Sequence, residues 1–81
     1  MSDTARVLVL TRPGCHLCDE ARTVIHEVCT ELDVAWTERD ITGDADLERD
    51  YGEQIPVTFV DGARHDFWRV DAQRLRRALI S

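Results

Sequence analysis

Two cysteines in a C-x-x-C spacing, Cys15 and Cys18, carry the most distinctive chemistry of this sequence. This spacing places two sulfurs about one helical turn apart, which is close enough for a disulfide of low strain. Pairs of this kind either exchange disulfides through a thiolate or bind a metal ion. Which chemistry is available depends on how the neighbouring elements position the two sulfurs.

The pair lies between a segment typical of a buried strand and a segment typical of an amphipathic helix. Arg6–Thr11 is apolar at consecutive positions, which predicts a central strand covered on both faces. In Cys15–Leu32 the apolar residues recur with a helical period and share one face, which includes Cys18. Cys15 is therefore expected at or just before the helix N-terminus, where unpaired N–H groups and the helix dipole favour a thiolate. Cys18, one turn deeper on the buried edge, suits the resolving thiol.

Alternation, turn residues and capping residues predict five further elements. Asp44 and Asp71 are the expected N-caps of two helices, and Asp61-Gly62 suits a tight hairpin turn because Gly tolerates positive φ. The elements are, in chain order, a strand, a short acidic helix, two strands of a hairpin and a closing helix: Val34–Glu38, Ala45–Tyr51, Val57–Val60, Ala63–Trp68 and Asp71–Ile80.

The resulting order, β-α-β-α-β-β-α, predicts an α/β fold. A strand–helix–strand start implies a right-handed crossover and a parallel strand pair, and the later hairpin adds antiparallel strands. We therefore expect a four-stranded mixed sheet with helices on both faces, formed by a single domain over residues 1–81.

Composition and charge exclude several classes of function. Hydrophobic residues make up 43% of the chain and charged residues 32%, which favours a globular fold over disorder. A formal net charge of −6 would repel nucleic acid. The longest apolar run, Val7–Leu10, is far shorter than the roughly 20 residues of a membrane helix, and the N-terminus has no signal-peptide pattern. We therefore expect a cytoplasmic protein without nucleic-acid or membrane partners.

In a reducing cytoplasm a close cysteine pair is expected to be catalytic or metal-binding, because structural disulfides are rare there. A zinc site needs two further ligands, and the candidate set is Cys15, Cys18, His26 and Cys29. On a continuous helix Cys29 lies about 16 Å beyond Cys18, too far for a shared ion. Residues 17–32 hold no Gly or Pro that would break the helix, so we expect no metal there. Cys29 is interpreted as an apolar core residue and His26 as a surface residue.

A second motif, Ile55-Pro56 before the strand at Val57–Val60, makes a family resemblance specific. The run VLVLTRPGCHLC at residues 7–18, followed by QIPVTFVDG at residues 54–62, resembles the glutaredoxin-like branch of the thioredoxin superfamily. Length, element order and both motifs match over nearly the whole chain. The resemblance implies a thioredoxin-like, glutaredoxin-type fold. It also implies a cis peptide bond before Pro56, beside the redox cysteines, and backbone pairing of Ile55 with the substrate.

The resemblance further implies a thiol–disulfide oxidoreductase of cell redox homeostasis. Cys15 would attack a disulfide of a protein or a small thiol, and Cys18 would resolve the mixed disulfide. Arg12 falls close to where glutaredoxins place a basic residue for the carboxylate of glutathione, which makes glutathione a candidate co-substrate. Glutathione or a reductase would supply electrons to a monomer without a bound cofactor. The Gly-Gly pair that glutaredoxins carry at their last helix is absent, and the matching region is Trp68–Asp71.

Two other functions remain compatible with the same motifs. One is a non-catalytic interaction domain that retains the fold. The other is a module that binds a metal, or an iron–sulfur cluster held between two subunits as in some glutaredoxins. Two residues near the cysteine pair have open roles as well. His16 either favours the thiolate of Cys15 as a cation or is simply solvated, and Trp68 is either a rim aromatic or a contact for a partner.

Overall fold

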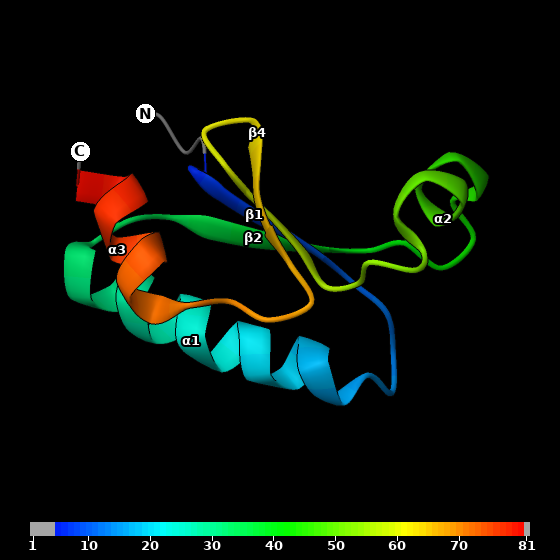
Figure 1. Ribbon diagram of the computed structural model, residues 1–81, viewed down its shortest axis with the longest axis horizontal. Helices are drawn as coiled ribbons and strands as arrows, with labels where there is room; N and C mark the ends of the chain where they lie inside the picture. Colours follow the sequence, from blue (N-terminus) through cyan, green and yellow to red (C-terminus); the bar gives the residue numbers. More distant parts are fainter. Residues whose placement is uncertain (1–4, 81) are drawn as a thin grey trace.

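The computed structural model describes residues 5–80, which form one four-stranded sheet and three helices (Figure 1). The strands are ordered β2-β1-β3-β4, with β1 parallel to β2 and antiparallel to β3, and β3 antiparallel to β4. The predicted element order and mixed sheet are therefore confirmed. The elements are β1 (Val7–Thr11), α1 (His16–Leu32), β2 (Trp36–Asp40), α2 (Ala45–Tyr51), β3 (Val57–Val60), β4 (Ala63–Phe67) and α3 (Ala72–Ile80).

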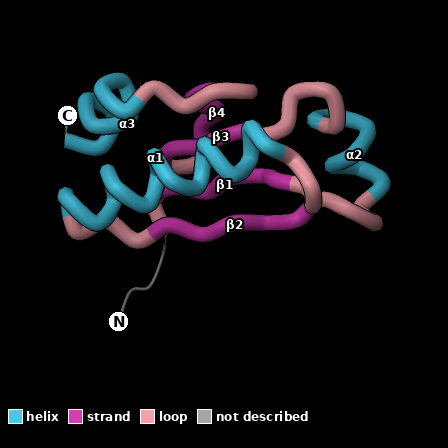
Figure 2. Tube along the Cα trace, turned by 90° about the horizontal axis from the view of Figure 1, so that it is seen from below, coloured by secondary structure: helices cyan, strands magenta, loops and turns pink. Residues whose placement is uncertain are grey.

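Alternate residues of β1 contribute to two apolar cores on opposite faces of the sheet. Val7 and Val9 are buried against α1 and α3, which lie on one face (Figure 2). Leu10 belongs to a second cluster, to which α2 adds Leu47 and Tyr51. Helices therefore contact both faces, as the continuous apolar run of the first strand predicts. None of the helices within residues 5–80 has the length and apolarity needed to cross a membrane.

Capping and turn residues set the ends of several elements. Cys15 and Asp44 are the N-caps of α1 and α2, and the Asp44 side chain accepts the Leu47 N–H at 3.1 Å. The hairpin between β3 and β4 turns at Asp61 and Gly62, with φ of 51° and 85°. Positive φ at both central residues is the geometry of a type I′ turn, which matches the twist of the flanking strands.

Three strands have boundaries that differ from the sequence prediction, and the first of them begins at Val7, not at Arg6. The second strand is Trp36–Asp40, not Val34–Glu38, because the Val34 N–H is bonded to the Cys29 carbonyl at 2.8 Å and closes the end of α1. The last strand ends at Phe67, not at the following Trp68, which has a φ of 63° and leaves the strand geometry. Weak alternation in a largely exposed edge strand gave little information on where that strand begins.

The core between α1, α3 and the sheet gives a stability prediction. Leu75 of α3 is fully buried in this core, whereas Ile80 of the same helix is 68% exposed. We expect Leu75→Ala to lower the free energy of unfolding by about 2–5 kcal/mol, because it leaves a cavity. Ile80→Ala should change that energy by about 0.5 kcal/mol or less. Urea unfolding of both variants tests this, and equal effects would contradict the described packing.

Candidate functional site

Cys15 lies immediately before the first residue of α1, where the chain turns from β1 into the helix. The turn includes Gly14 with a φ of 74°, a conformation that costs Gly little because it has no Cβ. Cys15 itself is extended (φ −102°, ψ 115°), and its Sγ accepts the backbone N–H of Cys18 at 3.2 Å. The sulfur thus takes the position of a capping oxygen at the positive end of the helix dipole. Cys15 is partly exposed, and the adjacent His16 is exposed.

Cys18 is fully buried one turn deeper. Burial is the main reason that its pKa is raised to about 11, and a hydrogen bond with Cys15 acts in the same direction. The backbone amide of Arg12 and the charge of Arg22 act against this rise. Cys15 and Cys18 are both free thiols in this structure. The pair therefore combines an accessible sulfur with a shielded, protonated one.

The Ile55-Pro56 motif lies in the same cluster as the cysteines. Ile55 packs with Cys18, Cys15 borders the cluster, and the peptide bond between Ile55 and Pro56 is cis. The Trp68 N–H donates to the carbonyl of Pro56 at 2.8 Å, which ties β4 to this turn. Within residues 5–80, neither the amide nor the carbonyl of Ile55 has a hydrogen-bond partner. Four of the five residues singled out from the sequence are thus brought together.

Arg12, the fifth, flanks the cluster with its guanidinium turned toward α2. It is exposed, and its Nη2 lies 3.4 Å from the position that a Cβ on Gly52 would occupy. The pKa of Asp40 is lowered chiefly by the backbone N–H of Thr42, with a smaller contribution from the Arg12 charge. Arg12 therefore offers a solvent-exposed positive charge between α2 and the cysteine pair.

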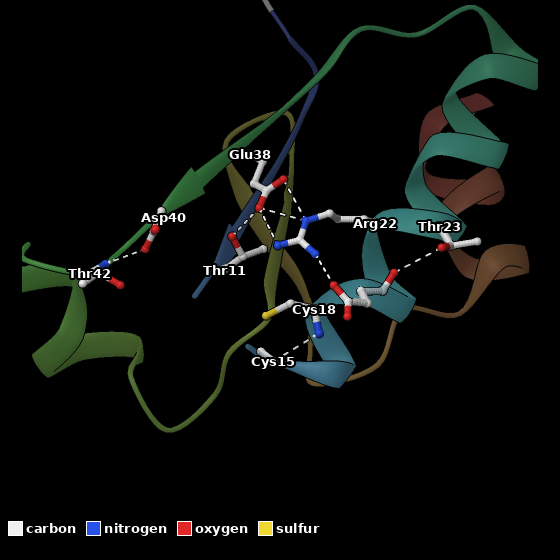
Figure 3. A network of polar contacts seen from close by, with 9 residues as sticks. Thr11, Cys15, Cys18, Arg22, Thr23, Glu38, Asp40 and Thr42 are labelled. Carbon is white, nitrogen blue, oxygen red and sulfur yellow. Dashed lines mark hydrogen bonds and ion pairs between the residues drawn. The ribbon is translucent and has the colours of Figure 1, made fainter. Parts of the chain in front are cut away.

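A polar network near Cys18 was not singled out from the sequence (Figure 3). Arg22 of α1 places its Nε 2.9 Å from each carboxylate oxygen of Glu38 in β2, and Glu38 accepts the Thr11 hydroxyl at 2.6 Å. Arg22 also pairs with Asp19. The Arg22 hydrogen bonds are the largest cause of a lowered pKa at Glu38. One sequence signal existed, because Arg22 follows Cys18 by four residues and so shares its helix face.

An apolar hollow lies beside the start of α1. It has a volume of about 300 Å³ and is lined by Leu17, Phe67, Trp68 and Arg69. Trp68 is 51% exposed, and its indole N–H donates to the carbonyl of Glu53 at 3.0 Å. Trp68 is therefore at the surface, beside Leu17, one of the two residues between Cys15 and Cys18.

The start of α3, where glutaredoxins carry their glycine pair, is capped by its own carboxylate. Asp71 Oδ1 accepts the backbone N–H groups of Gln73 and Arg74 at 2.9 and 3.1 Å. These bonds, with that of Arg74 the larger cause, lower the pKa of Asp71. Asp71 is thus the N-cap that its position in the sequence predicted. It also occupies two backbone donors that an anionic ligand would otherwise meet at this helix end.

The candidate zinc set does not assemble. That alternative required a break in the helix, and α1 runs unbroken from His16 to Leu32. Among the described residues, no three His, Cys, Asp or Glu side chains are grouped so that they could hold a metal ion. Cys29 is buried in the core between α1, α3 and the sheet, where burial raises its pKa, and His26 is exposed.

Comparison with known proteins agrees with this geometry. Residues 6–80 match the family model described as Glutaredoxin-like domain (DUF836). The chain belongs to this family. Uncharacterized protein Rv0508 of Mycobacterium tuberculosis is 36% identical over 76 residues, which cover 88% of this chain and 78% of that protein. Protein XcR50 from X. campestris has a similar structure, with a TM-score of 0.75, 34% identity and coverage of 90% of this chain and 93% of that one.

The fold is shared more widely. The thioredoxin of Fasciola hepatica superimposes with a TM-score of 0.59 at 17% identity, over 95% of this chain and 81% of that one. Such low identity shows a shared fold alone. Together with the family match, it shows a glutaredoxin-like domain with a thioredoxin-like fold.

The buried thiol of Cys18 gives a pH prediction. Its pKa of about 11 in the folded domain exceeds the ordinary value of 9.0, so the unfolded chain loses this proton first as pH rises. Between these two values the unfolded state binds fewer protons, and the free energy of unfolding must fall with increasing pH. Cys18→Ala should flatten this decline, measured by urea unfolding of the reduced protein. An unchanged slope would show that Cys18 is not shielded.

Proposed function

We propose that this domain is a thiol–disulfide oxidoreductase in which Cys15 is the nucleophile and Cys18 the resolving thiol. The observation that carries the proposal is the contrast between the two sulfurs. Cys15 is partly exposed at the N-cap of α1 and bonded to the Cys18 amide, while Cys18 is buried one turn deeper. A helix N-terminus stabilises a thiolate at the first position, and burial protects the second thiol until it is needed.

The exchange proceeds in two balanced steps. The Cys15 thiolate attacks one sulfur of the substrate disulfide, forms a mixed disulfide and releases the other sulfur as a thiolate, which takes a proton from solvent. Cys18 then loses its proton and attacks Cys15 Sγ, which releases the second substrate thiol. The substrate disulfide is reduced, and Cys15 and Cys18 are oxidised to a disulfide. Two electrons from glutathione or a protein reductase restore the dithiol.

Ile55 and Pro56 are proposed to orient the substrate. The amide and carbonyl of Ile55 have no partner within residues 5–80, and the residue packs beside Cys18. An extended substrate segment can satisfy both groups with backbone hydrogen bonds, which places its disulfide near Cys15. The partner is therefore a protein disulfide or a small peptide-like thiol. Arg12 is proposed to pair with a carboxylate of that partner, including one of glutathione.

Trapping of the mixed disulfide tests the assignment of the two cysteines. With insulin or glutathione disulfide as substrate, Cys18→Ser should retain a substrate thiol on Cys15, detectable as an added mass that dithiothreitol removes. Cys15→Ser should form no adduct and show only the uncatalysed rate of insulin reduction. Cys29→Ser is the matched control, because Cys29 is buried in the other core. A folded wild-type domain without turnover would favour the non-catalytic interaction domain instead.

The role of Arg12 gives a separate prediction. Arg12→Gln should raise the KM for anionic glutathione disulfide by about two- to fivefold, the range of an exposed ion pair. It should leave the KM for uncharged hydroxyethyl disulfide unchanged, since that substrate has no carboxylate. Arg64→Gln, which removes a charge from exposed β4, is the control. Equal changes with both substrates would argue that Arg12 affects the site without contacting a carboxylate.

A further inference from the structure

The resolving cysteine must carry negative charge in a place shielded from water. Cys18 attacks as a thiolate, yet its side chain is fully buried. Burial disfavours the charged form and is the main cause of its pKa of about 11. Only a very small fraction of the Cys18 thiol is therefore ionised at neutral pH. A source of positive potential next to Cys18 would directly accelerate this step.

Arg22 is a cation whose charge acts on Cys18. The two residues are four positions apart in α1, so their side chains lie on one helix face about one turn from each other. The Arg22 side chain is only 34% exposed and that of Glu38 only 32%. Both side chains are thus partly shielded from solvent, so their charges are screened somewhat less than those of a fully exposed pair.

The sheet holds the Arg22 guanidinium in place. Glu38 accepts two hydrogen bonds of 2.9 Å from Arg22 Nε, and Arg22 Nη2 lies 2.9 Å from Glu38 Oε2. Thr11, the buried last residue of β1, donates to the same carboxylate at 2.6 Å. The next backbone amide, that of Arg12, acts on Cys18 and lowers its pKa. The network thus connects to the surroundings of Cys18 through both α1 and β1 (Figure 3).

We propose that Arg22, fixed by Glu38 and Thr11, is a positioning residue for the resolving step, where it holds positive charge beside Cys18. The proposal rests on the function proposed above. In this step Cys18 gives its thiol proton to solvent, and its thiolate attacks Cys15 Sγ. The bond between Cys15 and the substrate sulfur breaks as the Cys15–Cys18 disulfide forms. The substrate sulfur leaves with the electron pair and takes a proton from solvent.

The titratable and charged groups around this thiolate come from α1 and from β2. Cys15 carries no charge in the mixed disulfide, so within α1 Arg22 supports the Cys18 thiolate and Asp19, which pairs with Arg22, partly offsets that support. Glu38 of β2 partly neutralises Arg22, and Asp40 of the same strand acts in turn on Glu38. The turn before β3 contributes the apolar side chain of Ile55. The sign of each variant's effect follows from this arrangement.

The test separates the two chemical steps in the full chain carrying Cys29→Ser. The probe is dithiobis(nitrobenzoate), an aromatic disulfide that releases a coloured thiolate. Attack by Cys15 releases the first thiolate at a rate proportional to the reagent concentration. Attack by Cys18 on the mixed disulfide releases the second thiolate at a rate that does not depend on the reagent concentration. Stopped-flow absorbance resolves these two phases, and each is followed as a function of pH.

Arg22→Gln should slow the second phase and leave the first unchanged. Loss of the Arg22 charge raises the pKa of Cys18. Each unit of such a rise lowers the thiolate fraction about tenfold, while the greater nucleophilicity of a more basic thiolate returns about threefold, so we expect a net slowing of up to about threefold at neutral pH. The pH at which the second phase levels off should rise, because the pKa of Cys18 rises when the Arg22 charge is lost. Arg22→Lys should restore most of the rate. Arg76→Gln, which breaks a comparable pair with Glu31, should alter neither phase.

Glu38→Gln distinguishes an electrostatic role from a structural one. Gln keeps an acceptor for Arg22 and Thr11 but removes the negative charge, so the second phase should become faster. If the second phase of Glu38→Gln is slower than that of the parent chain, or equal to it, the proposal is overturned. This result tests the proposal even if Arg22→Gln does not fold. A wild-type rate and pH profile in folded Arg22→Gln overturns it as well. Absence of both phases in the parent chain instead overturns the proposed function itself.

Discussion

The position at which α1 begins is the constraint on which the site depends. Because the helix starts at His16, Cys15 is left outside as its N-cap, and the Cys18 amide is free to donate to the Cys15 sulfur. If Cys15 were instead the first helical residue, it would lose the extended backbone conformation from which its sulfur caps the Cys18 amide. The turn at Gly14 and the pairing of β1 with two neighbouring strands hold this starting point.

Charge distribution around the cysteines is the second determinant. The chain has a net charge of −6, which is unfavourable for forming further anions. The site lies where this excess is locally offset, by the helix N-terminus at Cys15 and by Arg22 near Cys18. Arg suits the second role because its planar fork binds Glu38 with two nitrogens while it retains its charge. A Lys would hold its charge less firmly in one place.

Local patterns predicted most of the fold and the centre of the site. The helical period from Cys15, the turn at Asp61-Gly62 and the caps at Asp44 and Asp71 involve residues close in sequence, so they could be read directly. The network of Thr11, Arg22 and Glu38 could not, because it joins residues from three elements. Its formation depends on the register of β1 with β2 and on the packing of α1 across them, and neither leaves a signal in a single sequence. The sequence prediction misplaced the start of β2 for a related reason, since the Val34 N–H bonds the Cys29 carbonyl at the end of α1.

The place of Ile55 in the sheet limits how a bound chain can be held. β3 is already paired on both sides, with β1 and with β4, so an incoming segment cannot extend the sheet alongside it. Only the two backbone groups ahead of the strand are open. Recognition through so short a ladder contributes little free energy, about 0.5–1.5 kcal/mol for each hydrogen bond. In the proposed exchange, the product would therefore be held weakly once the covalent link is broken and would depart quickly, which would favour rapid turnover over tight complex formation.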